Sequence, residues 1–178
     1  MTVEQYISLG KRTAIFSFLS GTIIFLLYFF TSESILLLVG YAFIVVVGLL
    51  NLVVLIAISI KLSKEKESTK KLVRICVFMM LNMPIMISYC WLTTILLDTV
   101  RITFTNSTKF ELSNINITGC EKKIIDKLET GESKTIWIDI PNECEINIEY
   151  LSNGQRQIEN VVGYATEGKI KHSIGDQK

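Results

Sequence analysis

The stretch Lys61-Leu-Ser-Lys-Glu-Lys-Glu-Ser-Thr-Lys-Lys-Leu-Val-Arg74 carries six Lys/Arg in 14 residues and separates two long apolar segments. A Lys or Arg at the centre of a bilayer costs roughly 2.5–3.5 kcal/mol on insertion scales, so this basic loop stays on one side of a membrane. Short loops rich in Lys and Arg are favoured on the cytoplasmic side. The side that holds the basic loop therefore decides where both ends of the chain lie.

Three apolar segments surround the basic loop, at residues 13–30, 35–60 and 75–97, and none of them contains a charged residue. Each segment is long enough to cross a hydrocarbon core about 30 Å thick as a helix. The first segment is too long for a cleavable signal sequence, and two further spans follow it. We therefore expect residues 1–97 to form a membrane α-helical domain of three transmembrane helices, with the lipid bilayer as a partner.

Two amides and one proline interrupt the apolar segments: Asn51 in the second, and Asn82 and Pro84 in the third. An amide at bilayer depth usually finds a hydrogen-bond partner on another helix. A proline removes one backbone donor and tends to kink the helix. Two interpretations stay open, because these residues either pack a helical bundle or line a path or gate in an oligomer.

From Asp98 onward the apolar residues recur with a period of two, which is typical of half-buried strands. Ser152-Asn-Gly154 is the clearest hairpin turn. Strands are expected at residues 100–105, 112–117, 135–140, 146–150, 156–162 and 169–174. Six or seven short strands at regular spacing predict that residues 98–178 form a small all-β domain, an antiparallel sandwich or barrel.

The two halves of the chain differ in charge. Residues 1–97 carry eight Lys/Arg against four Asp/Glu, and residues 98–178 carry ten against thirteen, so the net charges are +4 and −3. An acidic soluble part argues against binding of DNA or long RNA, which requires a basic footprint. With one histidine and no catalytic or phosphate-loop motif, we expect no enzyme, no metal site and no cofactor.

The β domain nevertheless offers residues for a small-anion site. Trp137 lies opposite the face formed by Ile136, Ile138 and Ile140, which suggests stacking on a base, a partner or the membrane surface, or packing in a second layer. Arg and Lys donate to phosphate, and an aromatic ring stacks on a base. The candidate ligand-binding residues are therefore Trp137, Arg156, Tyr164, Lys169, Lys171 and His172. For His172 a surface position is also expected, because no motif places a carboxylate to orient it.

Several apolar helices followed by a compact C-terminal β domain resemble the membrane-bound accessory effectors of type III CRISPR antiphage defence. The resemblance covers the whole chain and rests on layout and size. It implies a homo-oligomer, a tetramer in that family, in a bacterial inner membrane. It further implies that a cytoplasmic β domain binds cyclic tetra-adenylate and perturbs the membrane or opens a pore.

The charge pattern favours the opposite orientation. If all three segments span, the basic loop and Lys11-Arg12 place the N-terminus in the cytoplasm and the β domain outside. That orientation suits a membrane-anchored immunity protein whose periplasmic β domain neutralises a secreted toxin. A disulfide between Cys120 and Cys144 is then expected, whereas a cytoplasmic domain predicts two free thiols. If Trp137 lies in one pocket with Arg156, Lys169 and Lys171, nucleotide sensing is favoured. If these residues lie apart, the immunity hypothesis is favoured.

Overall fold

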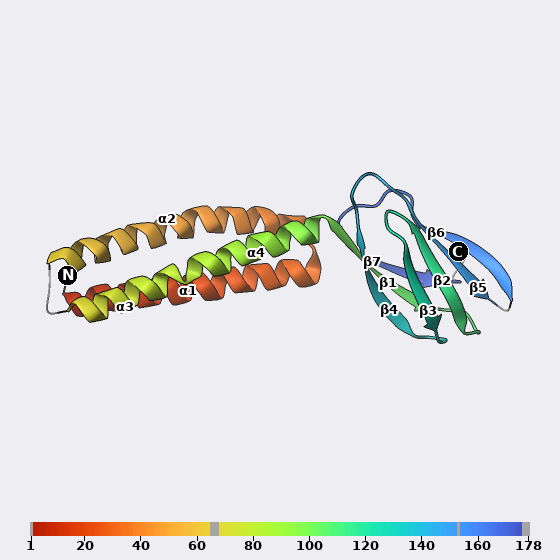
Figure 1. Ribbon diagram of the computed structural model, residues 1–178, viewed down its shortest axis with the longest axis horizontal. Helices are drawn as coiled ribbons and strands as arrows, with labels where there is room; N and C mark the ends of the chain where they lie inside the picture. The colour runs from red at the N-terminus through yellow and green to blue at the C-terminus, as the bar shows by residue number, and fades with distance from the viewer. Residues whose placement is uncertain (1, 65–67, 153, 176–178) are drawn as a thin grey trace. The chain divides into compact units, whose positions relative to one another are not determined.

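The computed structural model describes residues 2–64, 68–152 and 154–175, which form four helices and seven strands (Figure 1). The chain divides into two compact units, Met1–Thr93 and Thr94–Lys178. The first unit is helical and the second is a β-sandwich, as the sequence predicts. The hairpin turn expected at residues 152–154 includes Asn153, which lies outside the described residues, although Ser152 and Gln155 pair on either side of it.

The helices are α1 (Val3–Thr31), α2 (Ser34–Lys64), α3 (Thr69–Met80) and α4 (Asn82–Leu97). Three stretches are long and apolar enough to cross a membrane, since α3 and α4 together count as one. The three predicted spans lie inside these stretches, and the fold is that of a helical membrane region joined to a small β domain. The α3–α4 interruption falls at Leu81, because Pro84 has no N–H to donate to the carbonyl of Met80.

The tightest packing of the bundle lies near the end that carries the basic residues. Ile58 on α2 and Leu72 on α3 are fully buried there, and Ala14 on α1 is nearly so. Gly10 permits this close approach, because a Cβ at that position would lie 2.8 Å from Cδ1 of Ile58. The helices therefore continue past the predicted spans into a small packed cap, where Nζ of Lys71 lies 3.6 Å from the carboxylate of Glu4.

The β domain consists of two sheets that face each other across one core. The strands are β1 (Thr99–Asn106), β2 (Leu112–Gly119), β3 (Lys123–Leu128), β4 (Ser133–Asp139), β5 (Ile146–Ser152), β6 (Gln155–Val162) and β7 (Gly168–Ile174). Their order is β4–β1–β7 in one sheet, which we call the short sheet, and β3–β2–β5–β6 in the other, the long sheet. Fully buried side chains from both sheets, such as Phe104 and Ile148, form this core, and each contributes about 1.5–3 kcal/mol by burial.

Two features of the sandwich differ from the sequence prediction. The pairings of β1 with β4, β2 with β3, β2 with β5 and β5 with β6 are antiparallel, as expected, whereas β1 pairs with β7 in parallel, so the short sheet is mixed. Alternation fixes which face of a strand is buried but not the direction of its neighbour. Strand β3 was not predicted, because adjacent Ile124 and Ile125 break the alternation; Ile125 is buried, whereas Ile124 is 65% exposed.

A disulfide joins Cys120 to Cys144, with 5.2 Å between their Cα atoms. The two cysteines follow β2 and precede β5, which are hydrogen-bonded neighbours in the long sheet. Gly119 has a φ of +120°, and a Cβ there would lie 1.7 Å from the carbonyl oxygen of Glu145, so glycine is required. The sequence allows either a disulfide or two free thiols at Cys120 and Cys144, and the structure has the disulfide.

The last turn of α4 is grouped with the sandwich rather than with the helical unit. Oγ1 of Thr99 donates to the carbonyl of Ile95 at 2.6 Å, and the N–H of Ile140 donates to the carbonyl of Asp98 at 2.9 Å. The compact unit that contains the sandwich thus begins at Thr94, inside α4, because these hydrogen bonds tie the helix end to β1 and the end of β4.

Candidate functional surfaces of the β-sandwich

One row of side chains crosses the outer face of the short sheet. Arg101 on β1 pairs with Trp137 on β4 and with Lys169 on β7, so the three side chains lie side by side. Cζ of Arg101 lies 5.3 Å from the centroid of the Trp137 ring, which is a cation–π contact. Trp137 is 40% exposed while Ile138 is fully buried, so the predicted orientation of this strand is confirmed. We call these three residues the cationic row.

A second row, made mainly of hydroxyl groups, runs beside the cationic row. Thr103 pairs with Thr135 on one side and with Lys171 on the other. Oγ1 of Thr103 lies 2.9 Å from Oγ1 of Thr135. Lys171 is exposed and stands two residues from Lys169 on the same face of β7. Arg101 is only 4% exposed, so the accessible part of this outer face offers one aromatic ring, two lysines and several hydroxyl groups.

Three of the six candidate ligand-binding residues lie away from this face. Arg156 lies on β6 of the long sheet, where its guanidinium contacts the carboxylate of Glu149. Tyr164 is 58% exposed in the segment between β6 and β7. His172 lies on β7 but alternates with Lys171, and its ring stacks edge-on against the buried Phe104. The structure thus brings together Trp137, Lys169 and Lys171 only.

His172 has the carboxylate that the sequence did not reveal. Nε2 of His172 lies 3.1 Å from Oε2 of Glu159, which belongs to the other sheet. The hydroxyl of Tyr150 and the N–H of Gly175 both donate to Oε1 of the same carboxylate. Burial first, and then the hydrogen bond to Glu159, raise the pKa of Tyr150. The expectation of a surface histidine without an orienting carboxylate is wrong, because the contact forms only when the two sheets pack.

A polar hollow of about 350 Å³ opens beside this Tyr150–Glu159–His172 cluster. It is lined by Thr108, Tyr150, Ser152, Gln155, Gln157, Glu159 and Gly175. Within the described residues, no group of three or more His, Cys, Asp or Glu is arranged to hold a metal ion. The Tyr150–Glu159–His172 cluster links the two sheets. The hydroxyl and amide side chains that line the hollow beside it suit a small polar molecule at most.

The outer face of the long sheet alternates apolar and charged side chains on β5 and β6. Leu151 pairs with Arg156, and in the next row Glu149 pairs with Ile158. Ile158 is 68% exposed and Leu151 is 37% exposed. Ile124 on β3 extends the same row as Ile158 at the far edge of the sheet, because it pairs with Asn116 and Asn116 pairs with Glu149. We call Glu149, Leu151, Arg156 and Ile158 the hairpin patch.

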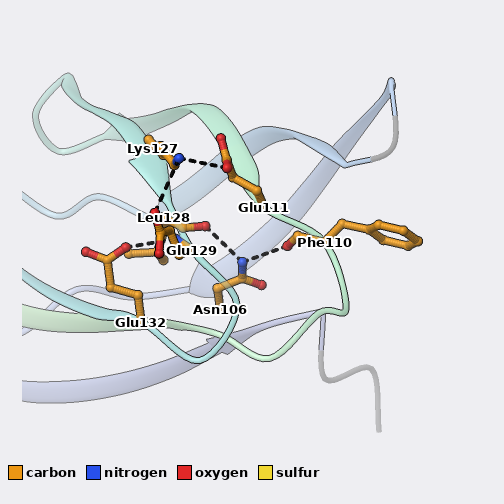
Figure 2. Close-up of polar contacts among 7 residues, drawn as sticks. All are labelled: Asn106, Phe110, Glu111, Lys127, Leu128, Glu129 and Glu132. Carbon is orange, nitrogen blue, oxygen red and sulfur yellow. Dashed lines mark hydrogen bonds and ion pairs between the residues drawn. The ribbon is translucent and has the colours of Figure 1, made fainter.

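A buried asparagine organises one end of the sandwich (Figure 2). The amide of Asn106 is fully buried and donates to the carbonyls of Phe110 and Leu128, at 2.8 and 2.9 Å. Lys127, on the surface nearby, lies 2.8 Å from the carboxylate of Glu111. The amide of Asn106 thus fixes the loop before β2 and the end of β3, so this cluster stabilises the fold.

In the helical unit, both intramembrane amides contact α1. Nδ2 of Asn51 donates to Oγ of Ser17 at 2.6 Å, and Nδ2 of Asn82 donates to the carbonyl of Ala14 at 3.0 Å. These contacts support the packing interpretation of Asn51 and Asn82. Oδ1 of Asn51 is buried without a hydrogen-bond partner among the described residues, and that polar atom is a weak point in the bundle.

Comparison with known proteins gives no relative. No family model, no curated protein and no solved structure matches the chain. The function must therefore be inferred from the surfaces of the molecule itself.

Sequence reasoning missed Arg101, Glu159 and Tyr150. Arg101 follows Val100 in an alternating strand, so its outward direction was available from the sequence. Its neighbours Trp137 and Lys169 are 36 and 68 residues away and are set by strand order. The Glu159–Tyr150 contact depends on the pairing of β5 with β6, which the hairpin turn predicts. The sequence does not reveal, however, that both side chains point into the sandwich.

Proposed function

We propose that this chain is a membrane-anchored binding protein that presents its β-sandwich outside the cytoplasm and neutralises a secreted protein toxin there. The observation that carries the proposal is the Cys120–Cys144 disulfide. Disulfides form and persist in oxidising compartments and are rare in the cytosol. The two cysteines of the sandwich are bonded to each other, whereas Cys76 and Cys90 of the helices are not in a disulfide.

The distribution of charge supports the same orientation independently. The start of α1, the end of α2 and the start of α3 lie at the same end of the bundle (Figure 1). The Lys and Arg that the structure describes in the helical unit belong to these parts of the chain: Lys11, Arg12, Lys61, Lys64, Lys70, Lys71 and Arg74. The turn between α1 and α2 contains Glu33 and no Lys or Arg. Positive residues near short loops favour the cytoplasmic side. With three spans, the sandwich then emerges on the other side.

The hairpin patch is the surface that suits a protein partner. Exposed Ile158 and Leu151 offer apolar area, and Arg156 with Glu149 offers a charge pair beside it. Protein interfaces combine apolar anchors with Arg and a polar rim in this way. A small anionic ligand would instead require several donors without an adjacent carboxylate, which Arg156 does not provide.

A photo-crosslinking amino acid at position 158 tests this proposal in intact cells. After exposure to medium containing a secreted toxin against which the chain protects, we expect a covalent adduct of sandwich and toxin. Position 133 on β4 provides the matched control, because Ser133 is exposed on the outer face of the other sheet. Crosslinking at 133 with none at 158, or protection that survives an Ile158→Asp substitution unchanged, would contradict the assignment of the hairpin patch.

Sensing of a cyclic oligoadenylate by a cytoplasmic sandwich stays the competing hypothesis. It is less well supported, because Arg156, Tyr164 and His172 do not join Trp137, Lys169 and Lys171 at one site. Calorimetry of the detergent-solubilised chain with cyclic oligoadenylates of three to six units separates the two. Binding tighter than about 100 μM, which corresponds to roughly 5.5 kcal/mol, would favour nucleotide sensing.

A further inference from the structure

We infer that the basic end of the helical bundle binds the phosphate groups of anionic lipids, with Arg12 and Arg74 as the main donors. The inference concerns the helical unit alone and does not depend on which side of the membrane holds the sandwich. It rests on the position of each arginine on its helix, on the charge of this end of the bundle and on the different levels of the two arginines along it.

Arg12 begins a stripe of exposed apolar side chains on α1. Phe16, Leu19 and Ile23 follow it at i+4, i+7 and i+11, positions that fall on one face of a helix. All three side chains are exposed, on a helix that is long and apolar enough to cross a membrane. Large apolar side chains exposed on such a helix face lipid, so Arg12 stands one turn from the first lipid-facing side chain of α1.

The outer face of α3 has the same pattern. Lys70, Arg74, Val77 and Leu81 repeat the spacing i, i+4, i+7 and i+11, and all four are exposed. Leu72, on the opposite face of α3, is fully buried in the bundle. Arg74 thus also stands about one turn from lipid-facing apolar side chains, where a long cationic side chain reaches the headgroups with its charged tip.

The charge of this end of the bundle favours an anionic partner. Residues 1–12 and 61–74 carry eight Lys/Arg against three Glu, so their net charge is +5. Neither Arg12 nor Arg74 forms a hydrogen bond or an ion pair within residues 2–64, 68–152 and 154–175. A guanidinium has five N–H donors and binds phosphate oxygens bidentately. Lipid phosphates therefore provide the acceptors that the described part of the chain does not.

Arg12 lies deeper along the bundle than Arg74. A Cβ on Gly10 would lie 3.1 Å from Cγ1 of Ile75 and 3.1 Å from Sδ of Met79. Both helices start at the same end of the bundle (Figure 1), so Arg12, two residues beyond Gly10, is level with about Met79. Arg74 comes five residues earlier on α3, which is about 7.5 Å at a rise of 1.5 Å per residue. Since charges away from water are screened less, Arg12 should discriminate most strongly for an anionic lipid.

Native mass spectrometry of the full chain in a neutral detergent measures this binding. The chain is titrated with phosphatidylglycerol, which carries a net negative charge, and with zwitterionic phosphatidylcholine. We expect phosphatidylglycerol to bind more tightly. A cation near an anionic headgroup contributes about fivefold in affinity, so Arg12→Gln with Arg74→Gln should weaken the binding of phosphatidylglycerol by roughly 25-fold. The binding of phosphatidylcholine should not change.

Further variants separate position from total charge. Arg12→Gln alone should weaken the binding more than Lys70→Gln, whose charge stands at the outer end of the α3 stripe. Arg12→Lys with Arg74→Lys should keep the preference for phosphatidylglycerol. Lys109→Gln with Lys122→Gln removes two charges from exposed positions of the sandwich and should leave the affinity unchanged. Thermal unfolding of the Arg12→Gln/Arg74→Gln chain should match that of the unmodified chain, because both arginines are exposed.

Three outcomes would overturn the inference. The first is equal affinity of the unmodified chain for the two lipids. The second is an equal loss of phosphatidylglycerol binding in the Lys109/Lys122 control. The third is displacement of phosphatidylglycerol by an equal concentration of inorganic phosphate, which would assign the two arginines to a free phosphate ligand.

Discussion

Glu159 on β6 and His172 on β7 join the two sheets of the sandwich, with 3.1 Å between carboxylate Oε2 and ring Nε2. The same carboxylate accepts hydrogen bonds from the hydroxyl of Tyr150 and from the N–H of Gly175. The side chain of Glu159 is only 15% exposed. Strand β5, strand β7 and the residue that follows β7 therefore all depend on this one mostly buried acceptor.

Replacing Glu159 by Gln should destabilise the sandwich by about 1–3 kcal/mol, because a mostly buried network loses its charged acceptor. The measurement is thermal unfolding of the detergent-solubilised chain, followed by near-ultraviolet circular dichroism. Glu143→Gln is the matched control, since Glu143 is exposed and its change should leave the transition within about 0.5 kcal/mol. Equal stability of the two variants would show that the network does not hold the sheets together.

The stability of the sandwich at alkaline pH should depend on the hydroxyl of Tyr150. Burial and the bond to Glu159 raise the pKa of its hydroxyl, whereas a tyrosine in an unfolded chain titrates near pH 10. The folded state thus holds this proton more tightly. The resulting stability is complete below about pH 10 and is lost as the pH rises through the raised pKa.

Tyr150→Phe should therefore flatten the decline of the melting temperature above about pH 10. Tyr164→Phe, on an exposed segment, should leave the decline in place. A decline of the same steepness in Tyr150→Phe would mean that another group controls alkaline unfolding.

The overall architecture could be read from the sequence because two periodicities are clear in it. Long runs without a charged residue, bounded by Lys11-Arg12 and by the basic loop, predict the spans, and alternation predicts the strands. The direction of Trp137 followed from Ile136 and Ile138. These are local patterns, and burial on one face is enough to produce them.

The arrangement of the candidate site could not be read in the same way. Which strands become neighbours is decided by how the two sheets close over a shared core, and that is a property of the whole chain. Arg156 was grouped with Lys169 because both are cations near the C-terminus, yet β6 and β7 belong to different sheets. Arg101 was overlooked because its partners Trp137 and Lys169 are remote in sequence.

The disulfide should account for a large part of the stability of the sandwich. Cys120 and Cys144 are 24 residues apart, and closing a loop of that length stabilises a fold by about 3–4 kcal/mol in the chain-entropy model. We expect Cys120→Ala with Cys144→Ala to lower the melting temperature of the sandwich and to match the effect of reductant on the unmodified protein. Cys76→Ala with Cys90→Ala is the control and should leave that transition unchanged.

Gly10 should be the least replaceable glycine of the bundle. A leucine there would overlap Ile58, Ile75 and Met79, whose side chains lie within 3.1 Å of an added Cβ. Overpacking of this kind costs about 1–3 kcal/mol. Gly48→Leu is the control, because nothing lies within 4 Å of a Cβ at that position. Equal thermal stability of the two variants in detergent would show that the basic end of the bundle is not tightly packed.

The side of the membrane that holds the sandwich is tested most directly by a dual reporter fused after Lys178, in which alkaline phosphatase is active only outside the cytoplasm and green fluorescent protein only inside. A disulfide-bonded sandwich opposite the basic loop predicts high phosphatase activity and no fluorescence. Replacing Lys61, Lys64, Lys70, Lys71 and Arg74 by Gln should weaken this preference, since those charges favour the cytoplasmic side. Fluorescence without phosphatase activity in the unmodified chain would place the sandwich in the cytoplasm and contradict its proposed role as a capture module for secreted toxins.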